Sequence, residues 1–150
     1  MNNVSIVSTP FGNLILTAND EALMRCDWTK KAIASRTNSA VLKMAASQLK
    51  AYFSKKLKRF DVPLALSGSD FQKNVWDALL QIPYGETRSY QDIAKNIDHA
   101  KAARAVGNAN GKNPLCIFIP CHRVIQASGH IGGYSGGVTY KVELLALEST

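Results

Sequence analysis

Residues 117–124 read IFIPCHRV, and the interpretation of the whole chain begins from this stretch. The apolar residues 115–119 are typical of a β-strand, which we expect to end at Pro120 because proline cannot continue the hydrogen bonding of a sheet. Cys121 follows, with a histidine and an arginine directly after it. Neighbouring cationic or proton-accepting groups lower the pKa of a thiol and favour the nucleophilic thiolate. Cys121 is therefore the leading candidate for a nucleophile, although free cysteines are also common core residues.

Upstream of this strand the sequence predicts two short helices joined by a turn. Ser89 is placed to cap a helix over residues 90–96, and a second helix is expected over residues 100–110. This pattern is a helix-turn-helix, which ordinarily sets its second helix in a DNA groove. The side chains of that helix are small except at Lys101 and Arg104, which favours binding directed by DNA shape or by a lesion over reading of base edges.

The remaining segments predict an α/β (α+β) fold with two domains. Short antiparallel strands are expected within residues 4–28 and an amphipathic helix over residues 39–57. A linker follows at residues 59–69. We therefore expect a small N-terminal domain, 1–65, with an antiparallel sheet and a helix. The C-terminal domain, 66–150, should be mostly helical, with the helix-turn-helix and a short active-site strand.

Charge and cysteine content restrict the partners. The net charge is +7, and the stretch between Asp98 and Glu143 contains no acidic residue, which suits a surface facing phosphates. Its basic residues are Lys101, Arg104, Lys112, Arg123 and Lys141. The three cysteines and three histidines are not spaced as zinc ligands, so we expect free thiols, no metal and no cofactor. No signal sequence or membrane span is predicted, which points to the cytoplasm, or to the nucleus in a eukaryote.

Three segments in this order carry a family resemblance: SYQDIAKNIDHAKAARAVGNANGKNP at residues 89–114, PCHRV at 120–124 and GGYSGG at 132–137. With them the chain resembles the O6-alkylguanine-DNA alkyltransferases, closely over residues 70–148 and in outline before that. The resemblance implies DNA repair by an irreversible methylated-DNA–protein-cysteine methyltransferase. Each molecule would act once, as a monomer, on double-stranded DNA. It would move the alkyl group of O6-alkylguanine, and of O4-alkylthymine, to Cys121 after base flipping.

The resemblance also implies roles for individual residues. His122 would deprotonate Cys121 through a water, Glu148 would orient His122, Asn113 would hold the active-site turn, and Tyr90 would donate a hydrogen bond to the guanine ring. Arg104 would fill the space left by the extruded base, with the helix in the minor groove. The DNA-binding positions are Lys101, Ala103, Arg104, Ala105, Gly107 and Arg123; the base pocket is formed by Val124, Gly132, Tyr134, Ser135 and Gly136.

Three other functions fit parts of the sequence. A non-catalytic module that senses alkylated DNA would share the helix-turn-helix, but such alkyltransferase-like proteins lack the acceptor cysteine, which is present here as Cys121. A transcription factor would have little need for the PCHRV segment or for a glycine-lined pocket. A thiol-based redox or hydrolytic enzyme on an unrelated fold would respond to peroxide or an ester and not to alkylated DNA.

Overall fold

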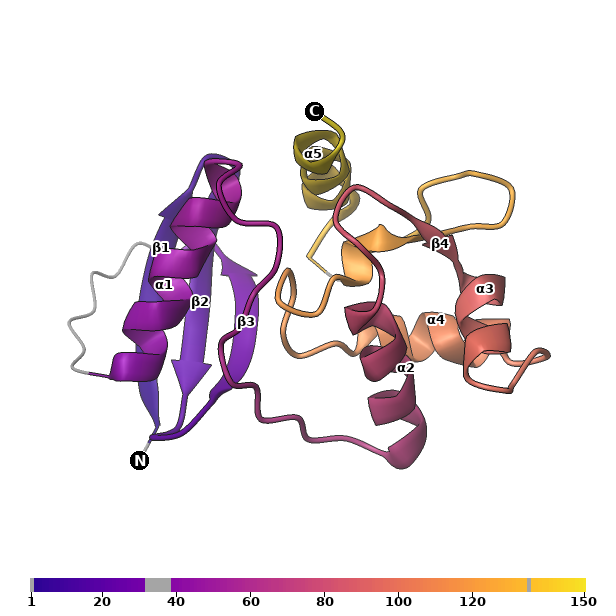
Figure 1. Cartoon of the computed structure of the whole chain (residues 1–150), viewed down its shortest axis with the longest axis horizontal. Coiled ribbons are helices and arrows are strands. Elements are labelled where there is room, and N and C mark those ends of the chain that lie inside the picture. Colours follow the sequence, from indigo (N-terminus) through magenta and orange to yellow (C-terminus); the bar gives the residue numbers. More distant parts are fainter. Residues whose placement is uncertain (1, 32–38, 135) are drawn as a thin grey trace. The chain divides into compact units, whose positions relative to one another are not determined.

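The computed structural model describes residues 2–31, 39–134 and 136–150 and divides the chain into two compact units, Met1–Leu66 and Ser67–Thr150 (Figure 1). We call the first the N-terminal unit and the second the C-terminal unit. Among the described residues, no helix has the length and apolar character needed to cross a membrane.

The N-terminal unit is a three-stranded antiparallel sheet with one helix packed on it (Figure 1). Strands β1 (Asn3–Thr9), β2 (Gly12–Ala18) and β3 (Leu23–Thr29) lie in the order β1-β2-β3. Helix α1 (Ala40–Phe53) begins at Ser39, whose side chain accepts a hydrogen bond from the amide of Leu42. This arrangement confirms the predicted antiparallel sheet with a helix.

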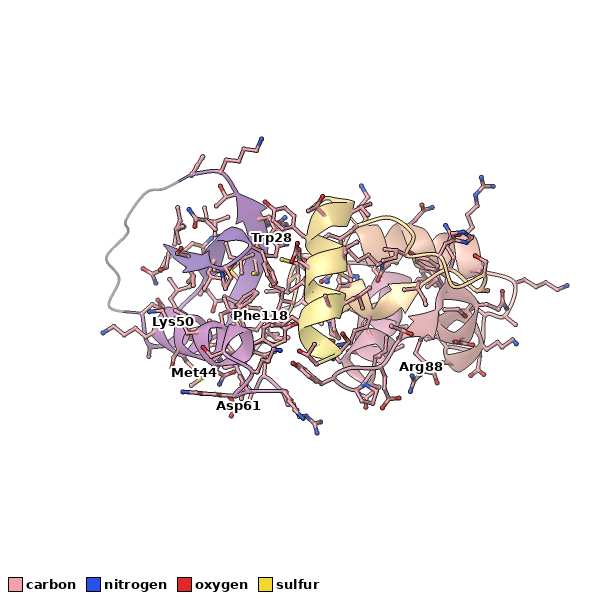
Figure 2. All side chains as sticks on the ribbon, turned by 90° about the horizontal axis from the view of Figure 1, so that it is seen from above. Trp28, Met44, Lys50, Asp61, Arg88 and Phe118 are labelled. Carbon is pink, nitrogen blue, oxygen red and sulfur yellow. The ribbon has the colours of Figure 1, made fainter. Side chains whose placement is uncertain are left out.

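Helix α1 has the amphipathic pattern that the sequence predicts. Its buried residues are Val41, Leu42, Ala45, Leu49 and Tyr52. Met44 and Lys50 lie on its exposed side (Figure 2). The helix ends at Phe53, earlier than predicted, because Lys55 adopts a positive φ of 63° that no right-handed helix can continue.

The C-terminal unit opens with one helix and continues with the two helices of the helix-turn-helix. Helices α2 (Asp70–Leu80) and α3 (Tyr90–Asn96) both start with capping boxes, at Ser69 and Ser89. Helix α4 (Ala103–Gly111) packs against α2 and α3. It begins later than predicted because Asp98 has a φ of 61° and the amide of Ala102 closes a turn onto the carbonyl of His99 at 2.8 Å.

The strand predicted over residues 115–119 is wrong. The segment is a buried, tightly folded loop in which Ile117 has a φ of 74°. The amide of Phe118 donates to the carbonyl of Cys116, and the amide of Ile119 donates to the carbonyl of Leu115, both at 2.9 Å. The apolar composition reflects the burial of this loop and not the pairing of a strand.

Strand pairing occurs instead just after the active-site segment. Cys121–Arg123 forms one turn of 3₁₀ helix, η1, which leads into the two-residue strand β5 (Val124–Ile125). Strand β5 pairs in parallel with β4 (Arg88–Ser89), whose Arg88 forms an exposed ion pair with Glu86 (Figure 2). This pairing brings the residues that follow Cys121 beside the start of α3.

The closing helix α5 (Val138–Glu148) buries two charged residues beside one of its leucines. Its buried residues are Lys141, Leu144 and Glu148, whereas Val142 is 44% exposed. The spacings of three and four place these three residues on one face. Charged side chains therefore point into the C-terminal unit, and the site described next accounts for them.

Candidate active site

Cys121 begins the short helix η1 and is 2% exposed. The loop before it is held at both ends by Asn113, whose Nδ2 donates to the carbonyl of Ile119 at 2.8 Å and whose Oδ1 accepts from the amide of Leu115 at 3.0 Å. Asn113 thus fixes the backbone that carries the thiol. The family resemblance implies a role of this kind for Asn113.

A buried ionic network surrounds Glu148 at the end of α5. His122 Nε2 lies 2.7 Å from Glu148 Oε2. Arg123 donates to the same carboxylate through Nε, at 2.8 Å, and through Nη2, at 3.0 Å, while its Nη1 donates to the carbonyl of Ile82 at 2.7 Å. The two-pronged pairing of Arg123 fixes both oxygens of Glu148 in place. The histidine is therefore oriented by a carboxylate that cannot rotate freely.

The remaining nitrogen of His122, Nδ1, is buried and has no hydrogen-bond partner among the described residues. Burial lowers the pKa of His122, against the opposing effect of its hydrogen bond to Glu148, so the ring is neutral at rest. A neutral imidazole that faces a carboxylate with Nε2 carries its hydrogen there. Nδ1 is then the nitrogen able to accept a proton.

The Cys121 thiol is also neutral at rest. Burial raises its pKa to about 12, whereas a hydrogen bond from Asn113 and the charge of Lys141 act in the opposite direction. A buried thiol with so high a pKa is protected from adventitious chemistry until a base removes its proton. The site therefore needs a proton acceptor, and His122 is the neighbouring residue in the chain.

Lys141 joins two segments around Cys121. Its side chain is buried, and its Nζ donates to the carbonyl of Val124 at 2.6 Å and to that of Gly133 at 3.0 Å. Nζ also lies 5.9 Å from the centre of the Tyr90 ring. Burial lowers the pKa of this lysine to about 8. The side chain ties the glycine-rich loop to the strand that follows the active-site helix.

A pocket of about 280 Å³ opens beside Cys121, a volume at the small end of ligand pockets. Gly132 lies against one of the lining residues: it has a φ of 77°, and a Cβ there would lie 3.0 Å from the hydroxyl of Tyr90. The pocket is lined by Tyr90, Gly107, Asn110, Gly111, Cys121, Gly133 and Tyr134.

The predicted base-pocket residues are only partly gathered here. Tyr134 lines the pocket, and Gly132 lies against Tyr90. The carbonyl of Val124 is held by Lys141. Gly136 is exposed and is not part of the lining, and Ser135 lies outside the described residues.

The predicted DNA-facing residues divide into two groups. Lys101, Arg104 and Ala105 are exposed on or just before α4, and Ala103 and Gly107 are half-buried. The placement of Arg123 on that surface is wrong, because its buried guanidinium binds Glu148 and Ile82. Lys141, expected to face phosphates, is likewise buried, so the acid-free stretch presents fewer cations than the sequence predicts.

Two features were not predicted from the sequence: Lys141 joins two backbone segments through its hydrogen bonds, and Asn110 lines the pocket. A signal for Lys141 was present, since the seven-residue spacing between Lys141 and Glu148 places both on one helix face together with Leu144. No sequence pattern marks Asn110. Among the described residues, no group of three metal-ligating side chains comes together.

Fold and geometry together define a helix-turn-helix protein with a candidate cysteine nucleophile in the same unit. Comparison with known proteins identifies the family. Residues 70–150 match the model "6-O-methylguanine DNA methyltransferase, DNA binding domain", and residues 4–66 match "6-O-methylguanine DNA methyltransferase, ribonuclease-like domain". The chain belongs to the 6-O-methylguanine DNA methyltransferase family.

Individual relatives agree with this assignment. The chain is 47% identical to a methylated-DNA–protein-cysteine methyltransferase of Methanosarcina acetivorans over 97% of both chains. The crystal structure of Mycobacterium tuberculosis OGT in complex with DNA superposes with a TM-score of 0.89 at 47% identity, covering 97% of this chain and 92% of that one. S. pombe Atl1, solved with damaged DNA containing O6-carboxymethylguanine, covers 55% of this chain and 79% of its own at 32% identity and a TM-score of 0.50.

Proposed function

We propose that this protein binds alkylated DNA and repairs it by moving the alkyl group of O6-alkylguanine to the sulfur of Cys121. One geometric observation carries the assignment of the acceptor: Cys121 lines a pocket and is followed by His122, whose ring is held 2.7 Å from the carboxylate of Glu148. A nucleophile, a base and a residue that orients the base are the parts of an activated thiol. Family membership and 47% identity over nearly the full length support the reaction.

In the reaction, the sulfur of Cys121 loses its proton and gains the alkyl group. His122 Nδ1 takes the proton of Cys121, through a water as the family resemblance implies. The sulfur attacks the alkyl carbon, the bond from that carbon to O6 breaks, and its electron pair stays with the base. Tyr90, at the pocket wall, donates towards the base as it leaves. The base takes up one proton, which balances the proton lost by Cys121, and stays in the DNA strand as guanine, while a thioether remains on Cys121.

The C-terminal unit would carry both DNA binding and transfer. The target atom is inaccessible inside a stacked duplex, so the base must be extruded into the pocket. Arg104 is exposed on α4, the helix that also contributes pocket residues, and its planar guanidinium can stack in the space that the base leaves. We propose O4-alkylthymine as a second substrate. The protein would act as a monomer, since all of these residues come from one chain, in the compartment that holds the DNA.

The test is the mass of the protein after mixing with a duplex that contains one O6-methylguanine. We expect a gain of one methyl group on the peptide containing Cys121, with no more product than protein. Cys121→Ala should abolish the gain, and Cys116→Ala, which removes a buried thiol from the same loop, should retain it. Lesion binding without a mass gain would instead identify a sensor, and product in excess of protein would refute single use.

A further inference from the structure

Asn110 occupies an unusual position on α4. Its side chain lines the pocket beside Cys121, yet the residue is only 5% exposed. Its Oδ1 has no hydrogen-bond partner among the described residues. A buried polar atom without a partner is costly and rare in native proteins, so one at a pocket wall suggests a partner that arrives with a ligand.

The orientation of the Asn110 amide follows from its surroundings. Nδ2 lies 3.4 Å from the carbonyl oxygen of Cys121, which can only accept a hydrogen bond. The amide nitrogen therefore faces that carbonyl, and the side-chain oxygen is left as an acceptor. The backbone of α4 is anchored nearby, because Trp76 Nε1 donates to the carbonyl of Ala109 at 2.9 Å.

Two backbone carbonyls near the pocket each accept one hydrogen bond from a side chain and keep a second lone pair, whereas Asn110 Oδ1 has no donor among the described residues. The carbonyl of Val124, a residue predicted to line the base pocket, accepts a hydrogen bond from Lys141 Nζ at 2.6 Å. The carbonyl of Cys121 receives the Asn110 amide. In the described part of the chain, two buried side-chain polar atoms have no hydrogen-bond partner, Asn110 Oδ1 and His122 Nδ1. His122 Nδ1 accepts the proton of Cys121 in the proposed mechanism. Asn110 Oδ1 has no such role and belongs to a residue that lines the pocket.

We propose that Asn110 determines base specificity by accepting a hydrogen bond from the 2-amino group of the extruded O6-alkylguanine. This inference rests on the proposed function. Alkylation at O6 leaves N1 of guanine without a hydrogen, so the 2-amino group is the remaining donor on that edge of the base. O4-alkylthymine carries an acceptor oxygen at O2 and no donor on this edge. Asn110 therefore favours alkylated guanine over alkylated thymine.

The experiment is a double-mutant cycle between the protein and the base. Single-turnover transfer rates are measured for wild type and Asn110→Leu on duplexes containing either O6-methylguanine or O6-methylhypoxanthine, which lacks the 2-amino group. We expect wild type to prefer O6-methylguanine by about tenfold, the worth of one hydrogen bond. Asn110→Leu, similar in size but without an acceptor, should react with both at nearly equal rates. Asn108→Leu, an exposed asparagine on the same helix, should keep the wild-type ratio.

Two further variants keep the outcome clear if the leucine variant is poorly folded. Asn110→Asp retains an acceptor and should preserve the preference even if its charge slows both reactions. Asn110→Ala removes the acceptor without adding bulk and should lose the preference. A wild-type ratio within twofold of unity, or an unchanged ratio in Asn110→Ala, would overturn the inference. Methyl transfer to Cys121 in wild type is scored in the same samples, so its absence would instead refute the proposed function.

Discussion

Replacing Lys141 by methionine should remove a pH dependence from the stability of the C-terminal unit. Methionine is close to lysine in length but lacks the charge and both hydrogen bonds that Nζ donates, to the carbonyls of Val124 and Gly133. In the folded protein burial lowers the pKa of Lys141 from its ordinary 10.5 to about 8. The unfolded chain restores the ordinary value. The folded and unfolded states therefore bind different numbers of protons above pH 8.

The sign and size follow from these two pKa values. Below pH 8 Lys141 is protonated in both states, and the folded state bears the whole cost of the buried charge, about 3 kcal/mol at 1.36 kcal/mol per pKa unit. Between pH 8 and 10.5 the unfolded state holds the additional proton, so stability rises with pH. From about pH 7 to about pH 9.5, wild type should gain about 2 kcal/mol relative to Lys141→Met.

Urea unfolding at several pH values measures this difference. A Trp28→Phe background leaves Trp76 as the single tryptophan, and Trp76 is buried in the C-terminal unit. The raised pKa of Cys121 acts in the opposite direction at high pH. Because the charge of Lys141 lowers that pKa, the comparison is made in a Cys121→Ser background, which removes the thiol from both proteins. Lys112→Met, which replaces an exposed lysine, provides the baseline.

A stability difference between wild type and Lys141→Met that stays constant from pH 7 to 9.5 would refute the reasoning. It would mean that Lys141 keeps its ordinary proton affinity and that its burial carries no cost. A difference that falls with pH would mean that the carbonyl oxygens hold the proton on Lys141 more strongly than water does.

Three further changes test the pocket, the ionic network and the DNA-facing helix. Gly132→Ala should destabilise the protein by about 1–2 kcal/mol, because its φ of 77° is unfavourable for alanine, and should slow transfer by crowding Tyr90. Glu148→Gln should lower stability by about 3–5 kcal/mol by leaving a buried guanidinium without its counterion, and should slow transfer about a hundredfold or more by releasing the histidine. Arg104→Ala should slow transfer from duplex DNA about tenfold or more and leave the reaction with the free O6-methylguanine base unchanged. Melting curves and single-turnover rates measure all three.

Each change has a matched control. At Gly133 a Cβ would meet no atom within 4 Å, so Gly133→Ala should be tolerated. Glu143→Gln alters an exposed carboxylate of α5 and should leave both readouts unchanged. Lys101→Ala should reduce the salt dependence of DNA binding without affecting transfer at saturation. If a control variant loses as much stability or transfer rate as the variant it is matched to, the contact that we name for the matched residue is not the cause of the loss.

Local rules predicted the helices well, because their signals lie within a few residues. Ser89 caps a helix as predicted, and Ser39 and Ser69 do the same, since each hydroxyl accepts a hydrogen bond from the amide three residues along the chain. Ser89 marks the first helix of the helix-turn-helix, whereas the second helix, α4, has no side-chain cap at its start. The loop at residues 115–119 could not be predicted in this way, since a positive φ at the β-branched Ile117 is uncommon and depends on the surrounding core.

The residues of the candidate site were predicted better than the burial and the partners of its charged side chains. The expected contact between His122 and Glu148 is present, at 2.7 Å. Arg123 and Lys141 were predicted to face phosphates because they lie in the stretch without acidic residues. Charged residues are almost never fully buried unless paired, and here both are paired. Their partners are Glu148, Ile82 and backbone carbonyls far along the chain, and only the folded structure brings these together.

The parallel pairing of β4 with β5 determines where the chain tolerates changes in length. Arg88 pairs with Val124 and Ser89 with Ile125, so the number of residues from β4 to Tyr90 and from Cys121 to β5 fixes the phenol and the thiol in relation to each other. One residue inserted between β4 and Tyr90 would displace the phenol relative to the thiol, and one inserted between Cys121 and β5 would displace the thiol relative to the phenol. Residues 126–130, which are exposed, can vary in length without moving either group. Peptide tags or reporter segments therefore belong in that turn and not beside the pairing.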